Sequence, residues 1–293
     1  DVLGPIDVWL ILLTVLANGF YPNWIAAGLE QSQINLVSQA LSKTVYIIIL
    51  LWVDDITLTG LFLALLVTSS IATCYSLRKL SFCFRGFNPS SENIPRHLKH
   101  GAPYFISTTL SASYSLLPAS ILGLYGDRNV GFYGIADSFY KAGQSAAFPV
   151  SQSLLPFLSR TKKASYFKVC VVTFLIMGIV VLFLINPHIA SLLDRFLGPE
   201  YLPAMEFIDI FLLIIPINFL NVMCGYPLYS IVGKTLIAAK TAMAGAILFW
   251  TSVSLLIFLD SLSALAICWI ILSVESCVFI LRICIFQRCP VHD

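Results

Sequence analysis

The chain has 293 residues and a formal net charge of +2; 58% of the residues are hydrophobic and only 11% are charged. A soluble domain carries about 25% charged residues, so this composition excludes a soluble globular protein, and the hydrophobic content excludes a disordered one. The small net charge gives no electrostatic basis for a nucleic-acid partner, and we expect none.

Long apolar runs follow one another along the chain, each of the length that a helix needs to cross the hydrocarbon core of a bilayer. They cover residues 7–28, 34–53, 57–77, 103–125, 136–158, 166–186, 205–226, 236–258 and 262–285. The runs are rich in Leu and longer than the alternating strands of a membrane β-barrel. The sequence therefore predicts an all-α polytopic membrane protein with about nine transmembrane helices.

Lysine and arginine gather in alternate connections between these runs. The connections at 78–101, 159–168 and 227–240 and the C-terminal end are basic, the last carrying Arg282 and Arg288. The connections at 53–57, 126–135, 187–204 and 259–261 are mostly acidic. Cytoplasmic connections collect Lys and Arg, so the basic set and the C-terminus are predicted to be cytoplasmic.

The same orientation places Asp1 outside, although the chain begins with neither Met nor a signal peptide. We therefore expect this chain to lack the first three helices of a protein with two six-helix lobes. An intact nine-helix protein is the alternative. In that interpretation residues 1–85 are a partial N-terminal lobe, residues 86–101 a cytoplasmic inter-lobe loop, and residues 102–293 a C-terminal six-helix lobe.

The fifth run carries a polar stripe at helical spacing, and such residues inside a span usually face a protein interior or a cavity. The alternative is a structural pair of Asp137 with Lys141 that reaches the outer interface. The stripe comprises Asp137, Lys141, Gln144, Ser145, Ser151 and Gln152.

The second run repeats this pattern with Asn35, Gln39, Lys43 and Tyr46. Lys43 lies near the middle of the run, where a charge is hardest to hide from lipid. It would act as a fixed cation in a translocation cavity. Alternatively, its side chain reaches back to the inner interface.

The fourth run is rich in hydroxyl groups, and Ser111 and Tyr114 share one broad face of it. These residues would line a cavity, or they would permit close helix packing. Glu275 lies in the middle of the last run, where it would take up a proton or pair with a cation. Together with Asp137 it is a candidate for ion coupling.

Sequence motifs for catalysis, cofactors or metals do not emerge. Gly233-Lys234-Thr235 resembles the end of a phosphate-binding loop, but Leu228 stands where that loop requires glycine. The eight cysteines form no CxxC pair, and no histidines stand at zinc-ligand spacing. We expect neither an enzyme nor a bound cofactor or metal.

Three segments resemble those of O-antigen and polysaccharide flippases of the Wzx type, in the multidrug/oligosaccharidyl-lipid/polysaccharide exporter superfamily. Residues 21–30 are similar to the segment that ends the fourth helix of that family, residues 126–136 to the entry of the eighth helix, and residues 148–160 to a Pro-rich helix end. The motif positions are Pro22, Trp24, Gly28, Glu30, Gly131, Tyr133 and Pro149.

The resemblance implies a two-lobed, twelve-helix transporter of the bacterial inner membrane, of which this chain supplies helices four to twelve. Such proteins move undecaprenyl-diphosphate-linked repeat units to the outer leaflet for lipopolysaccharide biosynthesis, upstream of the O-antigen polymerase machinery. The resemblance places Lys43 and Lys141 in helices that face the lumen. A cation-coupled multidrug exporter and a flippase for another lipid-linked glycan are the alternatives. A membrane glycosyltransferase would need a larger outer loop.

Overall fold

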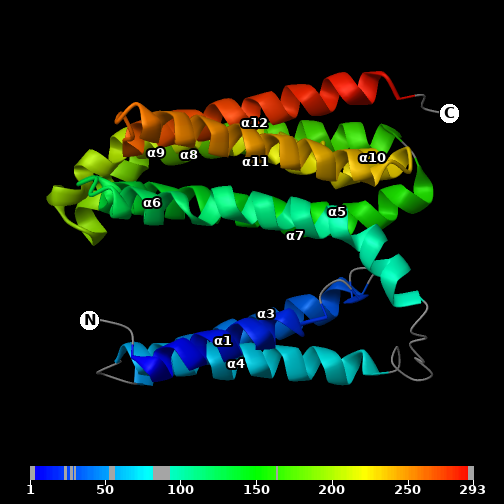
Figure 1. The fold of residues 1–293 in the computed structure, drawn as a ribbon, viewed down its shortest axis with the longest axis horizontal. Coiled ribbons are helices and arrows are strands. Elements are labelled where there is room, and N and C mark those ends of the chain that lie inside the picture. The colour runs from blue at the N-terminus through cyan, green and yellow to red at the C-terminus, as the bar shows by residue number, and fades with distance from the viewer. Residues whose placement is uncertain are drawn as a thin grey trace. The chain divides into compact units, whose positions relative to one another are not determined.

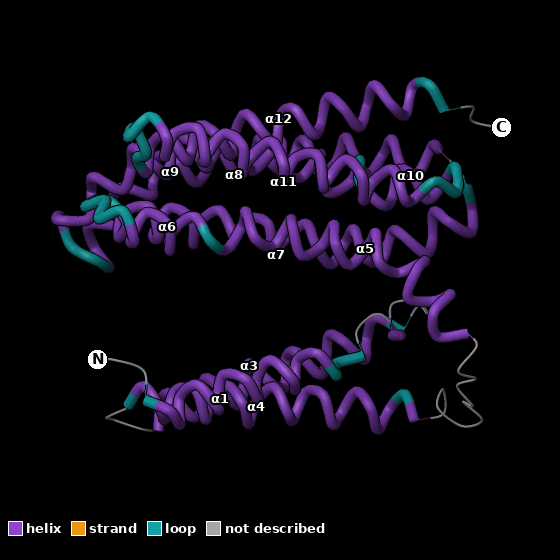
Figure 2. Tube along the Cα trace, viewed as in Figure 1, coloured by secondary structure: helices purple, strands orange, loops and turns teal. Residues whose placement is uncertain are grey.

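The computed structural model describes residues 4–22, 25–26, 29, 31–52, 57–81, 93–162 and 164–289. Figure 1 and Figure 2 show them as helices joined by short connections, with no strand in this part of the chain. The helices are α1 (Pro5–Gly19), α3 (Ser32–Trp52), α4 (Leu58–Lys79), α5 (Asn93–Leu116), α6 (Pro118–Leu124), α7 (Val130–Thr161), α8 (Ala164–Phe196), the 3-10 helix η2 (Pro199–Ala204), α9 (Met205–Met223), α10 (Tyr226–Ile231), α11 (Thr235–Phe258) and α12 (Ala264–Gln287).

The chain divides into two compact units, Asp1–Ser90 and Ser91–Asp293. In the first unit α4 packs against both α1 and α3. In the second unit α9 packs against α7, α8 and α12, and α11 packs against α5 and α12. The interior of the second unit is built largely from α9, where Phe207, Phe211 and Phe219 are buried.

Each of the nine predicted runs overlaps a helix in the described part of the chain, although α1 ends at Gly19, well before the end of the run at 7–28. Within the described residues, six helical segments are long and apolar enough to span a membrane, or seven if α5 and α6 form one span bent by 49°. Helix α1 has only 15 residues, and α7 carries the polar stripe, so neither is in that set. The prediction of an all-α polytopic membrane protein is confirmed.

Several helices extend beyond the predicted runs. Helix α5 begins at Asn93, so residues 93–101 of the expected inter-lobe loop are helical. Helix α8 continues to Phe196 and takes up half of the expected outer loop at 187–204. The short helix α10 lies in the expected connection at 227–240. The helices thus continue into segments that were predicted as connections, because hydropathy detects only the part of a helix that lies in hydrocarbon.

Local sequence signals fix several helix ends. The hydroxyl oxygens of Thr57 and Ser263 accept from the backbone N–H groups of Gly60 and Ala266, each at 3.2 Å, and so cap α4 and α12. Pro118 begins α6 directly after the bend that ends α5. Gly198 follows α8 with φ of +109°, a conformation that side chains rarely adopt.

Helices of the second unit approach closely where one of them carries glycine. A Cβ atom on Gly178 of α8 would lie 3.0 Å from the Cα atom of Pro216 in α9. A Cβ atom on Gly245 of α11 would lie 2.5 Å from Cγ2 of Val278 in α12. Small residues at such crossings let helices pack by van der Waals contact in lipid.

Gly178→Ala is expected to lower the free energy of unfolding by about 1 to 3 kcal/mol, because α8 must move away from the α9 backbone. Gly134→Ala is the matched control, since no atom lies within 4 Å of its added Cβ. This control is expected to leave stability unchanged or raise it by up to about 1 kcal/mol, through helix propensity. Thermal unfolding in detergent measures both, and equal losses would contradict the packing argument.

Candidate functional site

A small polar pocket in the first unit contains Lys43. Its volume is about 80 Å³, which is room for a compact polar group and not for an oligosaccharide. Helices α1, α3 and α4 all contribute to its wall. The lining residues are Asn18, Tyr21, Gln39, Ser42, Lys43, Tyr46, Leu65, Thr68, Ser69 and Ala72.

Hydrogen bonds between helices hold the polar wall of this pocket. The Tyr21 hydroxyl shares a hydrogen bond with Oγ of Ser38 at 2.5 Å and lies 3.4 Å from the side-chain oxygen of Asn35. Nδ2 of Asn18 donates to Oγ of Ser69 at 3.3 Å, which joins α1 to α4. The pocket therefore has hydroxyl and amide groups that are already oriented.

Lys43 has no ion-pair partner among the described residues. The described carboxylate of this unit, Asp7, is occupied elsewhere: it accepts from the Thr59 hydroxyl at 2.6 Å and from the Gly4 backbone N–H at 2.9 Å. Among the described residues, the Lys43 ammonium thus has no counter-charge at this polar pocket. An anion is the ligand that such a charge favours.

The structure brings Lys43, Gln39 and Tyr46 together in this pocket, while Asn35 is partly buried and lies beside Tyr21. The hydropathy pattern did not predict that Asn18 and Ser69 line this pocket, because single polar residues in apolar runs give no periodic signal.

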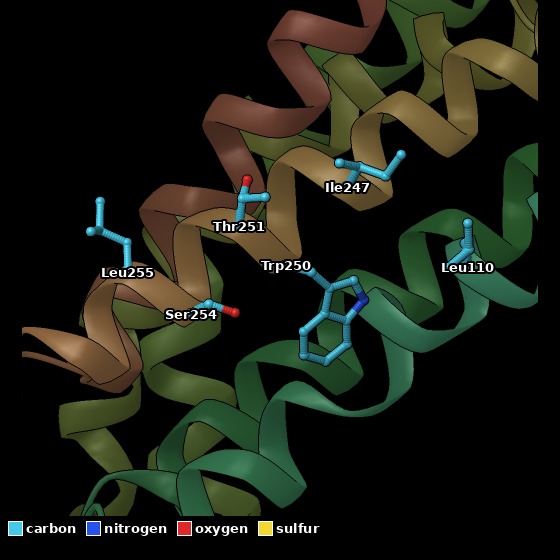
Figure 3. Close-up of a pocket in the computed structure, with 6 residues that line it drawn as sticks. All are labelled: Leu110, Ile247, Trp250, Thr251, Ser254 and Leu255. Atoms are coloured by element: carbon cyan, nitrogen blue, oxygen red, sulfur yellow. The ribbon is translucent and has the colours of Figure 1, made fainter.

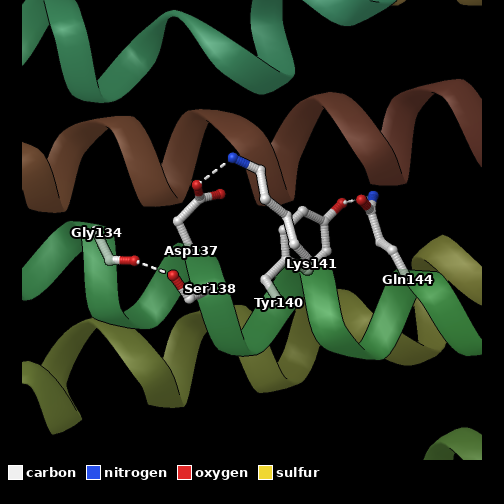
Figure 4. Close-up of polar contacts among 6 residues, drawn as sticks. All are labelled: Gly134, Asp137, Ser138, Tyr140, Lys141 and Gln144. Atoms are coloured by element: carbon white, nitrogen blue, oxygen red, sulfur yellow. Dashed lines mark hydrogen bonds and ion pairs between the residues drawn. The ribbon is translucent and has the colours of Figure 1, made fainter. Parts of the chain in front are cut away.

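The polar stripe of α7 lies in the second unit. Figure 4 shows Lys141 paired with Asp137, and Nε2 of Gln144 donating to the Tyr140 hydroxyl at 2.7 Å. The Lys141 side chain is 38% exposed and that of Asp137 is 14% exposed. The ion pair of Asp137 with Lys141, one of the two alternatives for this stripe, is therefore formed, whereas Lys43 has no such partner where the structure describes the chain.

Other polar residues of α5 and α7 are buried or partly buried. Tyr140 is buried and stacks on Phe211 with ring centroids 5.1 Å apart. Gln152 lies two turns beyond Gln144 and is partly buried, as is Ser111 on α5.

Glu275 is the centre of a buried polar cluster in the second unit. Its side chain is 4% exposed. Its two carboxylate oxygens accept from the Tyr114 hydroxyl at 3.1 Å and from Nδ2 of Asn221 at 2.6 Å. Helices α5, α9 and α12 thus meet at one carboxylate.

Arg282 of α12 belongs to the same buried cluster and connects it to α11. It is 9% exposed, and its Nη1 donates to the backbone oxygen of Asn221 at 2.6 Å while its Nε donates to Oγ1 of Thr241 at 3.1 Å. The Tyr229 hydroxyl donates to the Arg282 carbonyl at 2.7 Å. Arg282 is therefore not in a connection: it lies within α12, which continues to Gln287, and neighbouring helices cover it.

Two acceptors at this cluster have no hydrogen-bond partner within the described part of the protein. They are the Oδ1 atoms of Asn218 and Asn221, in side chains that are 6% and 3% exposed. Buried acceptors of this kind usually bind an ordered water or an ion. Composition alone gave no reason to select either asparagine.

Three of the motif residues, Pro22, Gly131 and Tyr133, lie within the described part of the structure. Tyr133 is buried edge-on against Phe211, and Gly131 is exposed in the first turn of α7. The neighbouring Asp127 accepts from the backbone N–H groups of Asn129 at 2.8 Å and Ala264 at 2.7 Å, which ties the start of α7 to the start of α12. Pro22 is buried. Trp24, Gly28, Glu30 and the Pro149 side chain lie outside the described residues.

Residues 6–162 match the family described as polysaccharide biosynthesis proteins. The match covers more than half of the chain and includes α3 with Lys43 and α7 with its ion pair. The chain belongs to this family. Comparisons with curated proteins and with solved structures find no match. Membership of this polysaccharide family and the apolar helices together support a polysaccharide-related membrane transporter that acts on lipid-linked glycans within the bilayer.

Proposed function

We propose that this member of the polysaccharide biosynthesis family is a flippase for undecaprenyl-diphosphate-linked O-antigen repeat units. It moves them from the inner to the outer leaflet of the bacterial inner membrane by alternating access. The observation that carries the proposal is the Lys43 ammonium, which lines a polar pocket within spanning helices and has no ion-pair partner in the described part of the chain.

The chemistry of the pocket matches the part of the substrate that is hardest to move. A diphosphate crossing a low-dielectric layer needs a fixed positive charge and hydrogen-bond donors. Lys43 supplies the charge, and the side-chain amide of Gln39 supplies a donor beside it. Further polar groups that would meet sugars lie on α5 and α7, among them Ser111, Tyr114, Gln144 and Gln152.

Within the proposal, Glu275 and Asp137 serve in ion coupling. The unpartnered oxygens of Asn218 and Asn221 beside Glu275 support this role, since acceptors and a carboxylate suit a small cation or a water chain. The C-terminus is cytoplasmic, and the polymerase machinery receives the product.

Deleting the gene for the full-length protein tests the function in cells. We expect the O-antigen ladder of the lipopolysaccharide to disappear while lipid-linked repeat units accumulate on the cytoplasmic leaflet. An intact ladder with another surface glycan lost would assign a different glycan. An intact set of glycans with loss of cationic dye efflux would favour the multidrug exporter instead.

Lys141→Ala tests the second cation. We expect a severalfold decrease in surface polysaccharide at unchanged protein level, because the lysine, although paired with Asp137, is partly exposed. The double variant Asp137→Asn, Lys141→Ala separates charge from pairing: it should remain defective if the cation itself is needed. Restored polysaccharide in the double variant would limit Lys141 to pairing with Asp137.

A further inference from the structure

The span that contains α9 and α10 is interrupted within the second unit. The segment Pro199–Ile231 is long and apolar enough to cross a membrane, yet α9 ends at Met223 and α10 begins at Tyr226. Pro227, in the first turn of α10, lacks the backbone N–H that an unbroken helix would offer to the Met223 carbonyl. The break therefore follows from the sequence, and it leaves carbonyl groups at the end of α9 that need other donors.

Arg282 of α12 contacts both sides of this break. Its Nη1 donates at 2.6 Å to the Asn221 carbonyl, which in an unbroken helix would accept from the N–H of Gly225. The backbone carbonyl of Arg282 accepts from the Tyr229 hydroxyl of α10 at 2.7 Å. A Cβ atom on Gly225 would lie 3.2 Å from the Asn221 oxygen and 3.4 Å from Nη1, so glycine leaves room for this contact. One arginine thus ties α9 to α10.

The two sides of the break have different neighbours. Helix α9 packs against α7, α8 and α12, whereas α10 packs against α7 and α11. Helix α11 is in turn fixed to α5. Trp250 projects from α11 toward α5 (Figure 3), and its Nε1 donates to Oγ of Ser113 at 2.8 Å. Oγ1 of Thr235 shares a second hydrogen bond with the Tyr104 hydroxyl at 2.9 Å. The break therefore lies where the chain passes from one group of packed helices to another, which is where hinges occur.

The buried cluster also offers the Arg282 guanidinium a second set of acceptors. Glu275 lies two helical turns before Arg282 on α12, and Asn221 contacts both: its Nδ2 donates to the carboxylate at 2.6 Å while its carbonyl accepts from Arg282. The Oδ1 atoms of Asn218 and Asn221 are buried and have no partner in the part of the protein that the structure describes. A guanidinium has more N–H donors than its contacts with Asn221 and Thr241 use. Once released from the Asn221 carbonyl, it therefore finds acceptors within the same cluster.

We propose that the junction of α9 and α10 is a hinge and that Arg282 is its latch. In the conformation described here the guanidinium bridges the break. When it moves to Glu275 and the asparagine oxygens, α10 turns about Gly225 away from the end of α9. A cation bound among those acceptors competes with the guanidinium for them, which links the hinge to ion coupling. The inference uses the alternating access of the proposed function and is independent of the substrate.

Two native cysteines make the hinge measurable. Cys224 lies in the break and is 2% exposed, whereas Cys268 lies within α12 and is 0% exposed. Opening of the hinge exposes Cys224 alone, while general loosening of the unit exposes both thiols. The full-length protein in phospholipid nanodiscs is treated with N-ethylmaleimide, and peptide mass spectrometry gives the alkylation rate of each cysteine.

Arg282→Lys keeps the positive charge but cannot replace the guanidinium at Asn221 and Thr241 together. We expect this variant to raise the alkylation rate of Cys224 severalfold and to leave that of Cys268 unchanged. Arg288→Lys, exposed directly after α12, is the matched control and should change neither rate. Equal increases at both cysteines, or a Cys224 rate like that of the unaltered protein, would overturn the proposal.

Gly225→Ala gives a second test that leaves the arginine in place. The added Cβ crowds the contact between the guanidinium and the Asn221 carbonyl, so we expect the same selective increase at Cys224. This variant decides if Arg282→Lys does not fold. Both variants are expected to slow transport severalfold at unchanged protein level, and normal transport by both would refute the hinge. Absence of transport by the unaltered protein would refute the proposed function and leave the alkylation result standing.

Discussion

Arg282→Ala is expected to lower the free energy of unfolding by about 3 to 5 kcal/mol, because it leaves buried partners without their charge and donors. Arg282 donates to the Asn221 carbonyl and to the Thr241 hydroxyl, and it lies in the same buried cluster as Glu275. Without the guanidinium these acceptors are unsatisfied, and the Glu275 carboxylate loses its nearest described counter-charge.

Arg288→Ala is the matched control, since Arg288 is exposed directly after α12. It is expected to change stability by less than about 0.5 kcal/mol. Thermal or denaturant unfolding in detergent measures both variants, and the yield of folded protein in membranes gives an independent readout. If Arg282→Ala is as stable as Arg288→Ala, the cluster does not hold α9, α11 and α12 together.

Lys43→Ala is expected to reduce transport of the lipid-linked glycan at least about tenfold, because one charge pair at 4 Å contributes up to about 4 kcal/mol in a partly screened site. Stability should change little, since no carboxylate of the described residues depends on this ammonium. Lys43→Arg retains the charge and should keep a large part of the activity.

Lys79→Ala provides the control in the same unit. Lys79 is exposed at the end of α4 and lies 6.0 Å from the Tyr75 ring. Transport into the outer leaflet and protein level are measured for all three variants. Normal transport by Lys43→Ala would remove the pocket of the first unit from the mechanism.

Hydropathy predicted the existence of the helices correctly but not their lengths. The apolar run at 166–186 predicted a span, yet α8 continues to Phe196 through residues that lie outside the most apolar window. Helix α5 likewise begins at Asn93, among polar residues that a hydrophobic window assigns to a loop. Helical backbone hydrogen bonds form in water as in lipid, so the hydrophobic boundary does not end a helix.

Helical spacing predicts which residues share one face of a helix. It does not predict which residues of different helices come into contact. Gln39 and Lys43, one helical turn apart, line the same small pocket, and Asp137 and Lys141 at the same spacing form an ion pair. The partners of Glu275 could not be read in this way. Tyr114 and Asn221 are separated from it by 161 and 54 positions in the chain, and only the packing of the helices brings them together.

Transport by the purified full-length protein in liposomes tests the central claim most directly. The liposomes contain labelled undecaprenyl-diphosphate-linked oligosaccharide, and an impermeant glycan-cleaving reagent reports how much of it lies in the outer leaflet. We expect this lipid to exchange between the leaflets only when the protein is present. Little exchange is expected in liposomes that contain the Lys43→Ala variant. Exchange at the same rate in protein-free liposomes, or at the same rate with Lys43→Ala, would contradict it.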